Sequence, residues 1–200
     1  NEDQRLMAIV LKEIDRLNAL ISEFLDFVKP EQVLDKVVDP NLILKEVLEM
    51  SQMNAKLRKD VLQQVELRGN RKILGNQDKL KQAFLNFVIN AYQAMEKVSE
   101  PKIIVSTAVE NGVFVVKIKD FGIGMSESTQ KRLFEPFFTT KHGGTGLGLA
   151  TTHKILESHE ARIHVESQEG RGTEFTIEFT KLAPIEQPAD NIKDIKRGHG

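Results

Sequence analysis

Seven apolar residues near the start of the chain are spaced alternately three and four positions apart, and this pattern constrains the fold more than any other feature. They are Met7, Val10, Ile14, Leu17, Ile21, Phe24 and Val28. This heptad seam predicts a long helix that packs against other helices. Leu6, Leu20 and Phe27 widen the stripe, which favours a multi-helix bundle over a two-stranded zipper. We expect the helix to end at Pro30.

The rest of the chain has an alternating pattern of helices and strands. The predicted elements are helices at about 41–54, 78–97 and 148–158, and strands at about 61–67, 72–75, 103–109, 113–119, 163–167 and 173–180. Asp39-Pro40 predicts an N-cap with proline at the first helical position. Asn111-Gly112 predicts a type I′ hairpin turn, because this pair accepts positive φ angles. The sequence therefore predicts an α/β fold, a two-layer sandwich of helices on a mixed sheet, preceded by one long bundle or coiled-coil helix.

Composition narrows the setting and the partners. The net charge of −1 gives no broad basic field for nucleic acid, so we expect no nucleic-acid partner. The chain has no cysteine, and no apolar run approaches the roughly 18 to 20 residues of a membrane span. We expect a soluble, cytoplasmic chain. Because it begins with Asn rather than Met, a membrane anchor or sensor is expected only in an upstream region.

The predicted helix at 78–97 has one apolar and one polar face. The apolar face contains Leu80, Phe84, Phe87, Val88, Ala91, Ala94 and Met95, and the polar face contains Gln82, Asn86, Asn90, Gln93 and Lys97. A solvated surface would explain the polar face. The alternative is the floor of a nucleotide site, because amide oxygens suit Mg²⁺ when phosphates complete its shell.

A second candidate site follows the strand at 113–119. Asp120-Phe-Gly-Ile-Gly-Met125 places a carboxylate at a strand end, and its two glycines let the backbone approach a ligand. A carboxylate there can accept from the exocyclic amine of adenine. An Asx-type turn with glycine would explain the same residues without a ligand.

A glycine-rich run precedes the helix at 148–158. Gly143-Gly-Thr-Gly-Leu-Gly-Leu149 leads directly into apolar helix, which favours phosphate binding by backbone N–H groups over a flexible linker. Lys141 could add a charge to the phosphates. The tail from residue 183 has prolines and many charges without periodicity, so we expect residues 183–200 to be disordered.

Other nucleotide and metal families lack their required motifs here. Asp120-Phe-Gly occurs without the catalytic loop and the lysine strand of eukaryotic-type protein kinases. Walker A and dinucleotide-binding motifs are also missing. The five histidines, His142, His153, His159, His164 and His199, do not form a metal-binding pattern.

In order, five motifs resemble the ATP-site boxes of bacterial two-component sensor histidine kinases, in the superfamily that also includes gyrase, Hsp90 and MutL. They are Asn86-x-x-x-Asn90-Ala91, Asp120-x-Gly122-x-Gly124, Phe134-Glu-Pro-Phe-Phe138, Gly144-Thr-Gly-Leu-Gly-Leu149 and Gly170-x-Gly172-Thr173-x-Phe175. Each motif alone is weak, whereas five in this order are specific. The resemblance implies a Bergerat-type ATP-binding domain at 31–182. It also implies that residues 1–30 are the second helix of a dimerisation and phosphotransfer hairpin, whose first helix is missing.

The resemblance also implies roles for individual residues. Asn90 would bind Mg²⁺, Asn86 would support the phosphates or metal waters, and Asp120 would accept from the adenine amine. Gly122 and Gly124 would give the adenine room, and Thr173 would contact it through water. The phosphate loop would comprise Gly144, Thr145, Gly146, Leu147 and Gly148, with Lys141 beside it. A lid at Phe121–Thr145 would be mobile without nucleotide.

Two departures from the family pattern are visible. Gln93 stands where many members have a lysine three residues after the metal-binding Asn, and Lys141 is the expected substitute. The acceptor histidine with its neighbouring acidic base is missing from this chain. Because Asn86 replaces the glutamate base of gyrase-type relatives, the resemblance favours transfer over hydrolysis.

The first hypothesis is therefore the ATP- and Mg²⁺-binding catalytic region of a histidine kinase, with Asn86, Asn90 and Lys141 as its catalytic residues. It would transfer the γ-phosphoryl group to a histidine on the missing helix, signal to a response regulator and self-associate through the Met7–Val28 seam. Two alternatives remain: a nucleotide-binding sensor or scaffold module without transfer, and a gyrase-like ATPase.

Overall fold

The computed structural model describes residues 2–29, 36–141 and 144–184. Its elements are α1 (Glu2–Val28), β1 (Lys36–Val38), α2 (Pro40–Met53), β2 (Leu62–Leu67), β3 (Ile73–Gly75), α3 (Gln77–Ala94), β4 (Lys102–Glu110), β5 (Val113–Asp120), α4 (Glu127–Arg132), α5 (Gly148–Ser158), β6 (Ala161–Gln168) and β7 (Gly172–Phe179). Pro30, Gly143 and most of the predicted disordered tail, residues 185–200, lie outside the described residues.

The main sheet is mixed, as predicted. Its five strands follow the order β2-β4-β5-β7-β6, in which β2 runs parallel to β4 and the other neighbours are antiparallel. Asn111 and Gly112 have φ angles of 50° and 80°, which confirms the predicted tight turn between β4 and β5. A second, two-stranded sheet pairs β1 with β3. Strand β1 was not predicted, because three residues are too few to show alternation.

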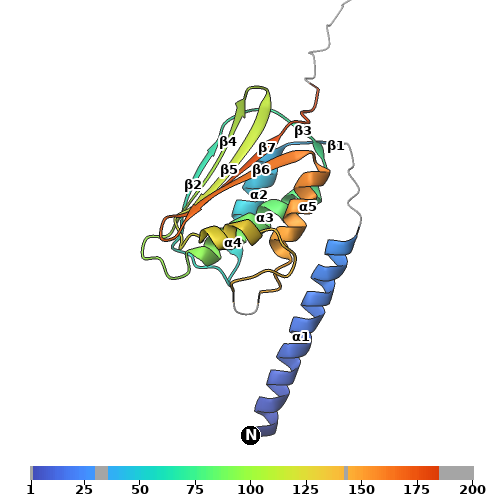
Figure 1. The fold of residues 1–200 in the computed structure, drawn as a ribbon, viewed down its shortest axis with the longest axis vertical. Coiled ribbons are helices and arrows are strands. Elements are labelled where there is room, and N and C mark those ends of the chain that lie inside the picture. The colour runs from blue at the N-terminus through green and yellow to red at the C-terminus, as the bar shows by residue number, and fades with distance from the viewer. Residues whose placement is uncertain (1, 30–35, 142–143, 185–200) are drawn as a thin grey trace, which may run out of the picture.

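Helices α2, α3 and α5 lie over one face of the main sheet, so the domain has two layers (Figure 1). Two aromatic pairs join α3 to β7 of the sheet. The Phe87 ring lies 4.7 Å from that of Phe175, and the Phe84 ring meets Phe179 edge-on at 6.3 Å. All four side chains are buried, and each contributes about 1.5–3 kcal/mol through removal from water. The α/β sandwich predicted from the sequence is confirmed.

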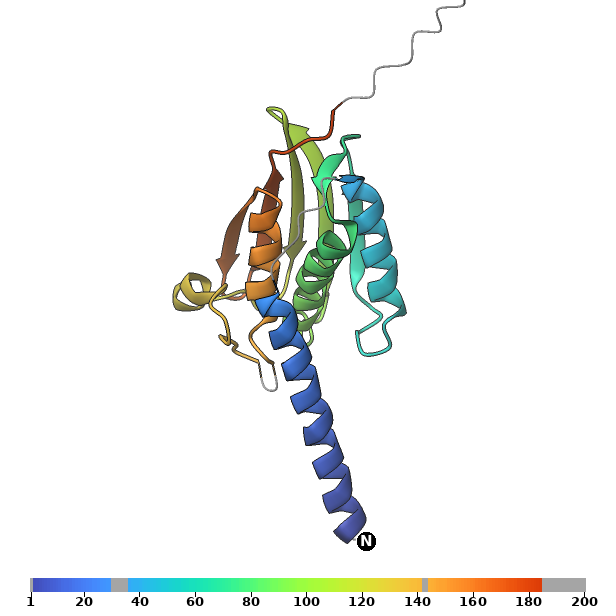
Figure 2. The ribbon, with the colours of Figure 1, turned by 90° about the vertical axis from the view of Figure 1, so that its right-hand side faces the viewer.

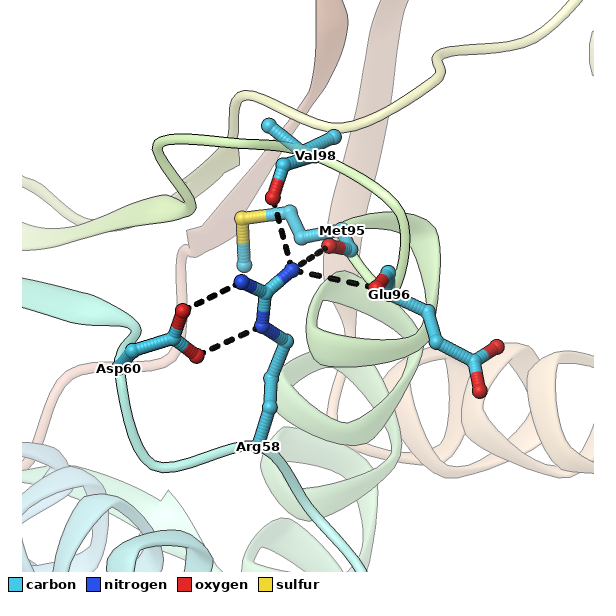
Figure 3. A network of polar contacts seen from close by, with 5 residues as sticks. All are labelled: Arg58, Asp60, Met95, Glu96 and Val98. Atoms are coloured by element: carbon cyan, nitrogen blue, oxygen red, sulfur yellow. Dashed lines mark hydrogen bonds and ion pairs between the residues drawn. The ribbon is translucent and has the colours of Figure 1, made fainter.

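Helix α3 carries the predicted amide stripe, and both of its ends are fixed by side chains. Asn76 caps its N-terminus by accepting from the N–H groups of Asp78 and Lys79. At the other end Arg58 donates to the carbonyl oxygens of Met95, Glu96 and Val98 and is held by Asp60 (Figure 3). The three carbonyl distances are 2.6, 3.2 and 2.8 Å. These carbonyls face Arg58 instead of continuing the helix, so α3 ends at Ala94 and not near residue 97 as predicted.

The first helix confirms the predicted helical seam, and the described residues leave most of that seam uncovered. Of the seam side chains, Phe24 stacks on Phe137 with ring centroids 6.3 Å apart. Helix α1 extends away from the sandwich, and its C-terminal end lies beside α5 (Figures 1 and 2). The seam side chains are 40–61% exposed, from Phe24 to Met7. No helix of the described residues is long and apolar enough to cross a membrane.

Candidate functional site

Asn86 joins the amide stripe of α3 to the first turn of α5. Its side-chain nitrogen donates to the Gly148 carbonyl at 3.2 Å and to the Thr152 hydroxyl at 3.1 Å. No described residue donates to its Oδ1 atom. Gln82, Asn86 and Asn90 of the predicted stripe are therefore half-buried, whereas Gln93 and Lys97 are exposed, and an acceptor remains available at Asn86.

Lys141 brings a positive charge to the next turn of the same stripe. Its ammonium donates to Asn90 Oδ1 and to Gln93 Oε1, both at 2.5 Å. Desolvation of the ammonium lowers the pKa of Lys141, and attraction to the Asp120 carboxylate opposes that shift. Lys141 thus interacts both with the amides of α3 and with Asp120 at the end of β5. Asn90 already accepts from a cation in this arrangement.

Asp120 is 3% exposed at the end of β5. Its Oδ1 atom accepts from the backbone N–H groups of Gly122 at 2.9 Å and Thr173 at 3.3 Å, whereas no described residue donates to Oδ2. Burial raises the pKa of Asp120 to about 6, and the two N–H groups oppose this shift. The bond to Gly122 is the Asx-type turn considered as an alternative, and it still leaves one oxygen for a ligand.

The glycines after Asp120 make room for protein backbone, a reason for their presence that the sequence did not show. A Cβ on Gly122 would lie 2.7 Å from the carbonyl of Ala94 at the end of α3. A Cβ on Gly124, whose φ is +64°, would lie 1.9 Å from the Gln168 carbonyl oxygen. Both glycines therefore let the turn pack against its neighbours, and their role toward adenine stays a prediction.

The N-terminus of α5, which follows the predicted phosphate loop, lacks a side-chain cap. Asp39, Asn76 and Ser126 cap α2, α3 and α4, but no side chain caps α5. A Cβ on Gly148 would have nothing closer than the Asn86 amide at 3.8 Å. The free N–H groups of this helix turn therefore face an open position next to Asn86.

The other loop residues have different surroundings. A Cβ on Gly144 would lie 2.7 Å from the Thr139 hydroxyl oxygen, and one on Gly146 would lie 2.4 Å from the Phe137 carbonyl carbon. Leu147 is fully buried, so only its backbone can face a ligand. The Thr145 hydroxyl donates to Glu23 of α1. Within residues 144–148, the side chains of Thr145 and Leu147 are thus occupied by contacts within the protein.

Comparison with known proteins identifies the family. The model of the histidine kinase-, DNA gyrase B- and HSP90-like ATPase family matches residues 75–183, which contain all the predicted site residues. The chain belongs to this family. The expected Bergerat-type superfamily is thereby confirmed.

Sensor histidine kinases are prominent among the relatives of this ATPase-family chain. It is 37% identical to sensor histidine kinase ZraS of Escherichia coli (strain K12), over 88% of this chain and 37% of ZraS. It is 34% identical to sporulation kinase E of Bacillus subtilis (strain 168), over 93% of this chain and 24% of that kinase. The chain therefore spans well under half of these curated relatives.

Solved structures of histidine kinases share the fold of this ATPase-family domain. Full-length ShkA in complex with AMPPNP matches with a TM-score of 0.76 at 25% identity, over 91% of this chain and 40% of ShkA. The catalytic domain of histidine kinase ThkA matches with a TM-score of 0.64 at 27% identity, over 76% of this chain and 97% of that domain.

Sequence reasoning about this family member missed three polar contacts at the site. Thr152 shares the Asn86 amide, Ser167 contacts Thr173 at 3.0 Å, and Gln130 donates to the carbonyls of Met125 and Ser167. Helix α4, which carries Gln130, was also not predicted, because it has only six residues. Ser167 did carry a signal, since it follows Ala161, Ile163 and Val165 on the inner face of β6 and is the first polar residue there.

Proposed function

We propose that this chain is the ATP-binding catalytic region of a histidine kinase, with ATP held between α3, the end of β5 and the first turn of α5. The observation that carries the proposal is the Asn86 bond to Gly148 at the uncapped start of α5. It puts the amide stripe and the free N–H groups of a helix terminus one hydrogen bond apart. Amide oxygens that can bind a metal thus lie close to N–H groups that can bind an anion. This combination suits a metal-bound polyphosphate.

The donor set also fits Mg²⁺ as the companion of the nucleotide. Asn90 Oδ1 faces the Lys141 ammonium, so it already binds a cation. Within residues 2–29, 36–141 and 144–184, no three His, Cys, Asp or Glu side chains gather into a metal site of their own. Mg²⁺ bound through Asn90 would therefore take its other ligands from phosphates and water and would neutralise phosphate charge.

Three groups of this chain then have distinct roles. Asp120 accepts from the adenine amine through Oδ2, and the N–H groups of α5 hold the phosphates. Lys141, whose ammonium donates to Asn90 in this structure, would pair with a phosphate oxygen in the nucleotide complex.

The reaction we propose is transfer of the γ-phosphoryl group to a histidine outside this chain. An imidazole nitrogen attacks the γ-phosphorus, and the bond from that phosphorus to the bridging oxygen breaks. ADP leaves with the electron pair, and the second imidazole nitrogen loses its proton to a base on the acceptor helix. The protein contributes positioning and charge neutralisation. Asn86 is a neutral amide and cannot activate water as a base, which favours transfer over hydrolysis.

In the intact protein, residues 1–30 would be the second helix of the acceptor hairpin, and residues 31–182 the catalytic domain. The phosphorylated histidine would then donate its phosphoryl group to a response regulator. The family relatives named sensor histidine kinases support this assignment.

Calorimetry with and without Mg²⁺ tests the proposed binding of ATP and the metal role of Asn90. Asn90→Ala should weaken Mg²⁺-dependent binding by about tenfold or more, roughly 1.4 kcal/mol, and leave folding nearly unchanged. Gln82→Ala, two turns earlier on the polar face of α3, is the matched control and should bind ATP normally. Equal affinities for Asn90→Ala and the parent chain would refute the metal role.

Transfer is tested with γ-labelled ATP and an acceptor hairpin supplied as a separate chain. Label on the acceptor histidine supports a kinase. Tight ATP binding with no labelled hairpin would support a sensor module, and steady release of inorganic phosphate would support a gyrase-like ATPase.

A further inference from the structure

The inner face of the sheet changes from apolar to polar along one row of paired residues. Asp120 of β5 pairs with Thr173 of β7, which in turn pairs with Ser167 of β6. In the next row on the same face, Ile118, Phe175 and Val165 occupy the same three strands. Directly paired residues project to the same side of a sheet. Ser167 therefore belongs to the row that contains the proposed adenine-binding residues.

The hydrogen bonds of Ser167 determine the direction of its contact with Thr173. The Ser167 hydroxyl donates its single proton to the Gly172 carbonyl at 2.9 Å, and its oxygen accepts from the Met125 N–H at 2.9 Å. Its 3.0 Å contact with the Thr173 hydroxyl can then be made only with Thr173 as the donor. This bond uses the only proton of the Thr173 hydroxyl.

The row consequently offers acceptors alone to a ligand. Thr173 Oγ1 has given its proton to Ser167, and Asp120 Oδ2 is without a donor among the described residues. An exocyclic amine, directly or through a water, can donate to such a surface. A carbonyl oxygen at the same position of the base cannot, because acceptor would face acceptor.

We propose that Ser167 is a positioning residue that sets base specificity: by taking the Thr173 proton, it makes the base end of the site select a 6-amino purine over a 6-oxo purine. This inference rests on the proposed binding of ATP. Ser167 also holds Met125, directly after the Asp120 turn, so the same hydroxyl ties the start of the lid to the base site.

The test compares ATP with inosine triphosphate, which has a 6-oxo group, by calorimetry on the full chain. Ser167→Ala frees the Thr173 hydroxyl to rotate and donate. It should therefore reduce the ratio of ATP to inosine triphosphate affinity by about 3- to 10-fold, the factor for one hydrogen bond. Ser167→Thr keeps the hydroxyl and should restore the ratio. Ser106→Ala, on the outer face of the same sheet, is the matched control and should leave the ratio unchanged.

A double-mutant cycle with Thr173→Val shows whether Ser167 acts through Thr173. The valine variant keeps the side-chain shape and removes the hydroxyl, so Ser167→Ala should cause no further change in the ratio when it is added. If Ser167→Ala does not fold, Ser167→Thr and Thr173→Val carry the test. The first should keep the parent ratio and the second should lower it.

Equal weakening of both nucleotides by Ser167→Ala would show that the residue only supports the fold, and would overturn the inference. So would a parent chain that binds ATP and inosine triphosphate equally well. A parent chain that binds neither nucleotide would refute the proposed function itself, which separates the two failures.

Discussion

Asp120→Asn should make the ligand-free protein more stable at neutral pH while it weakens nucleotide binding. Burial raises the pKa of Asp120 from 3.8 to about 6, so the native state binds more protons than the unfolded state between these pH values. The stability of the parent chain therefore falls as pH rises through this window. The destabilisation is absent below 3.8 and complete above 6. Asparagine resembles the protonated acid, because its carbonyl oxygen can still accept from Gly122 and Thr173.

The expected size of this effect follows from the raised pKa. A shift of about two units corresponds to ~3 kcal/mol, as an order of magnitude, because each unit is worth about 1.36 kcal/mol. The side chain is 3% exposed, so solvent screening reduces this value little. The variant should therefore gain up to ~3 kcal/mol relative to the parent between pH 4 and pH 7.5.

Urea unfolding at several pH values measures this difference. Asp60→Asn is the control of opposite sign, because the hydrogen bond from Arg58 lowers the pKa of Asp60. The stability that Asp60 contributes is present above its unfolded pKa and is lost as pH falls through the folded one. A difference between Asp120→Asn and the parent that stays constant from pH 4 to 7.5 would refute the reasoning about Asp120.

Binding should change in the opposite direction to stability. The amide places a donor where Oδ2 accepted, which should cost about 1–3 kcal/mol of ATP affinity. Parent affinity should also fall below pH 6 by up to about tenfold per unit as Asp120 is protonated. Asp120→Asn measured over the same range corrects for titration of the ATP phosphates. An Asp120→Asn chain that binds ATP as well as the parent would mean that the base is recognised elsewhere.

The lid, Phe121–Thr145, should show little protection from hydrogen exchange in the free protein and more with ATP and Mg²⁺; strong protection without nucleotide would contradict this. Ile14→Asp combined with Ile21→Asp should give a monomer that still binds ATP, whereas the parent should self-associate in analytical ultracentrifugation. A parent chain that stays monomeric at high concentration would contradict this prediction. Arg58→Ala should lower the midpoint of urea unfolding, because three carbonyls at the end of α3 lose their donor, and Arg58→Lys should recover only part of the loss. An unchanged midpoint would show that water replaces the guanidinium without cost.

The core of the fold could be predicted because its signals are local. The buried face of α3, the Asp39 cap of α2 and the turn at Asn111 each follow from the spacing or the chemistry of neighbouring residues. Of the predicted apolar face of α3, only Ala94 is half-buried instead of buried. The end of α3 was misplaced, because Arg58 lies far away in sequence and nothing near residue 94 signals it.

The sequence by itself determined the family, the two-layer fold and the residue types at the site, because motif order and periodicity are properties of one chain read in one direction. The tertiary structure decided how those residues face one another. Only the pairing of β5, β7 and β6 brings Ser167 to Thr173, and only the packing of α3 on α5 brings Asn86 to Gly148. The close approach of the Ala94 backbone to Gly122 was not predicted, since the two residues are close in space and not in sequence. The direction of the hydrogen bond between Thr173 and Ser167 depends on partners that are distant in sequence, and so does the close approach of the Ala94 backbone to Gly122. No local pattern of residues encodes either of them.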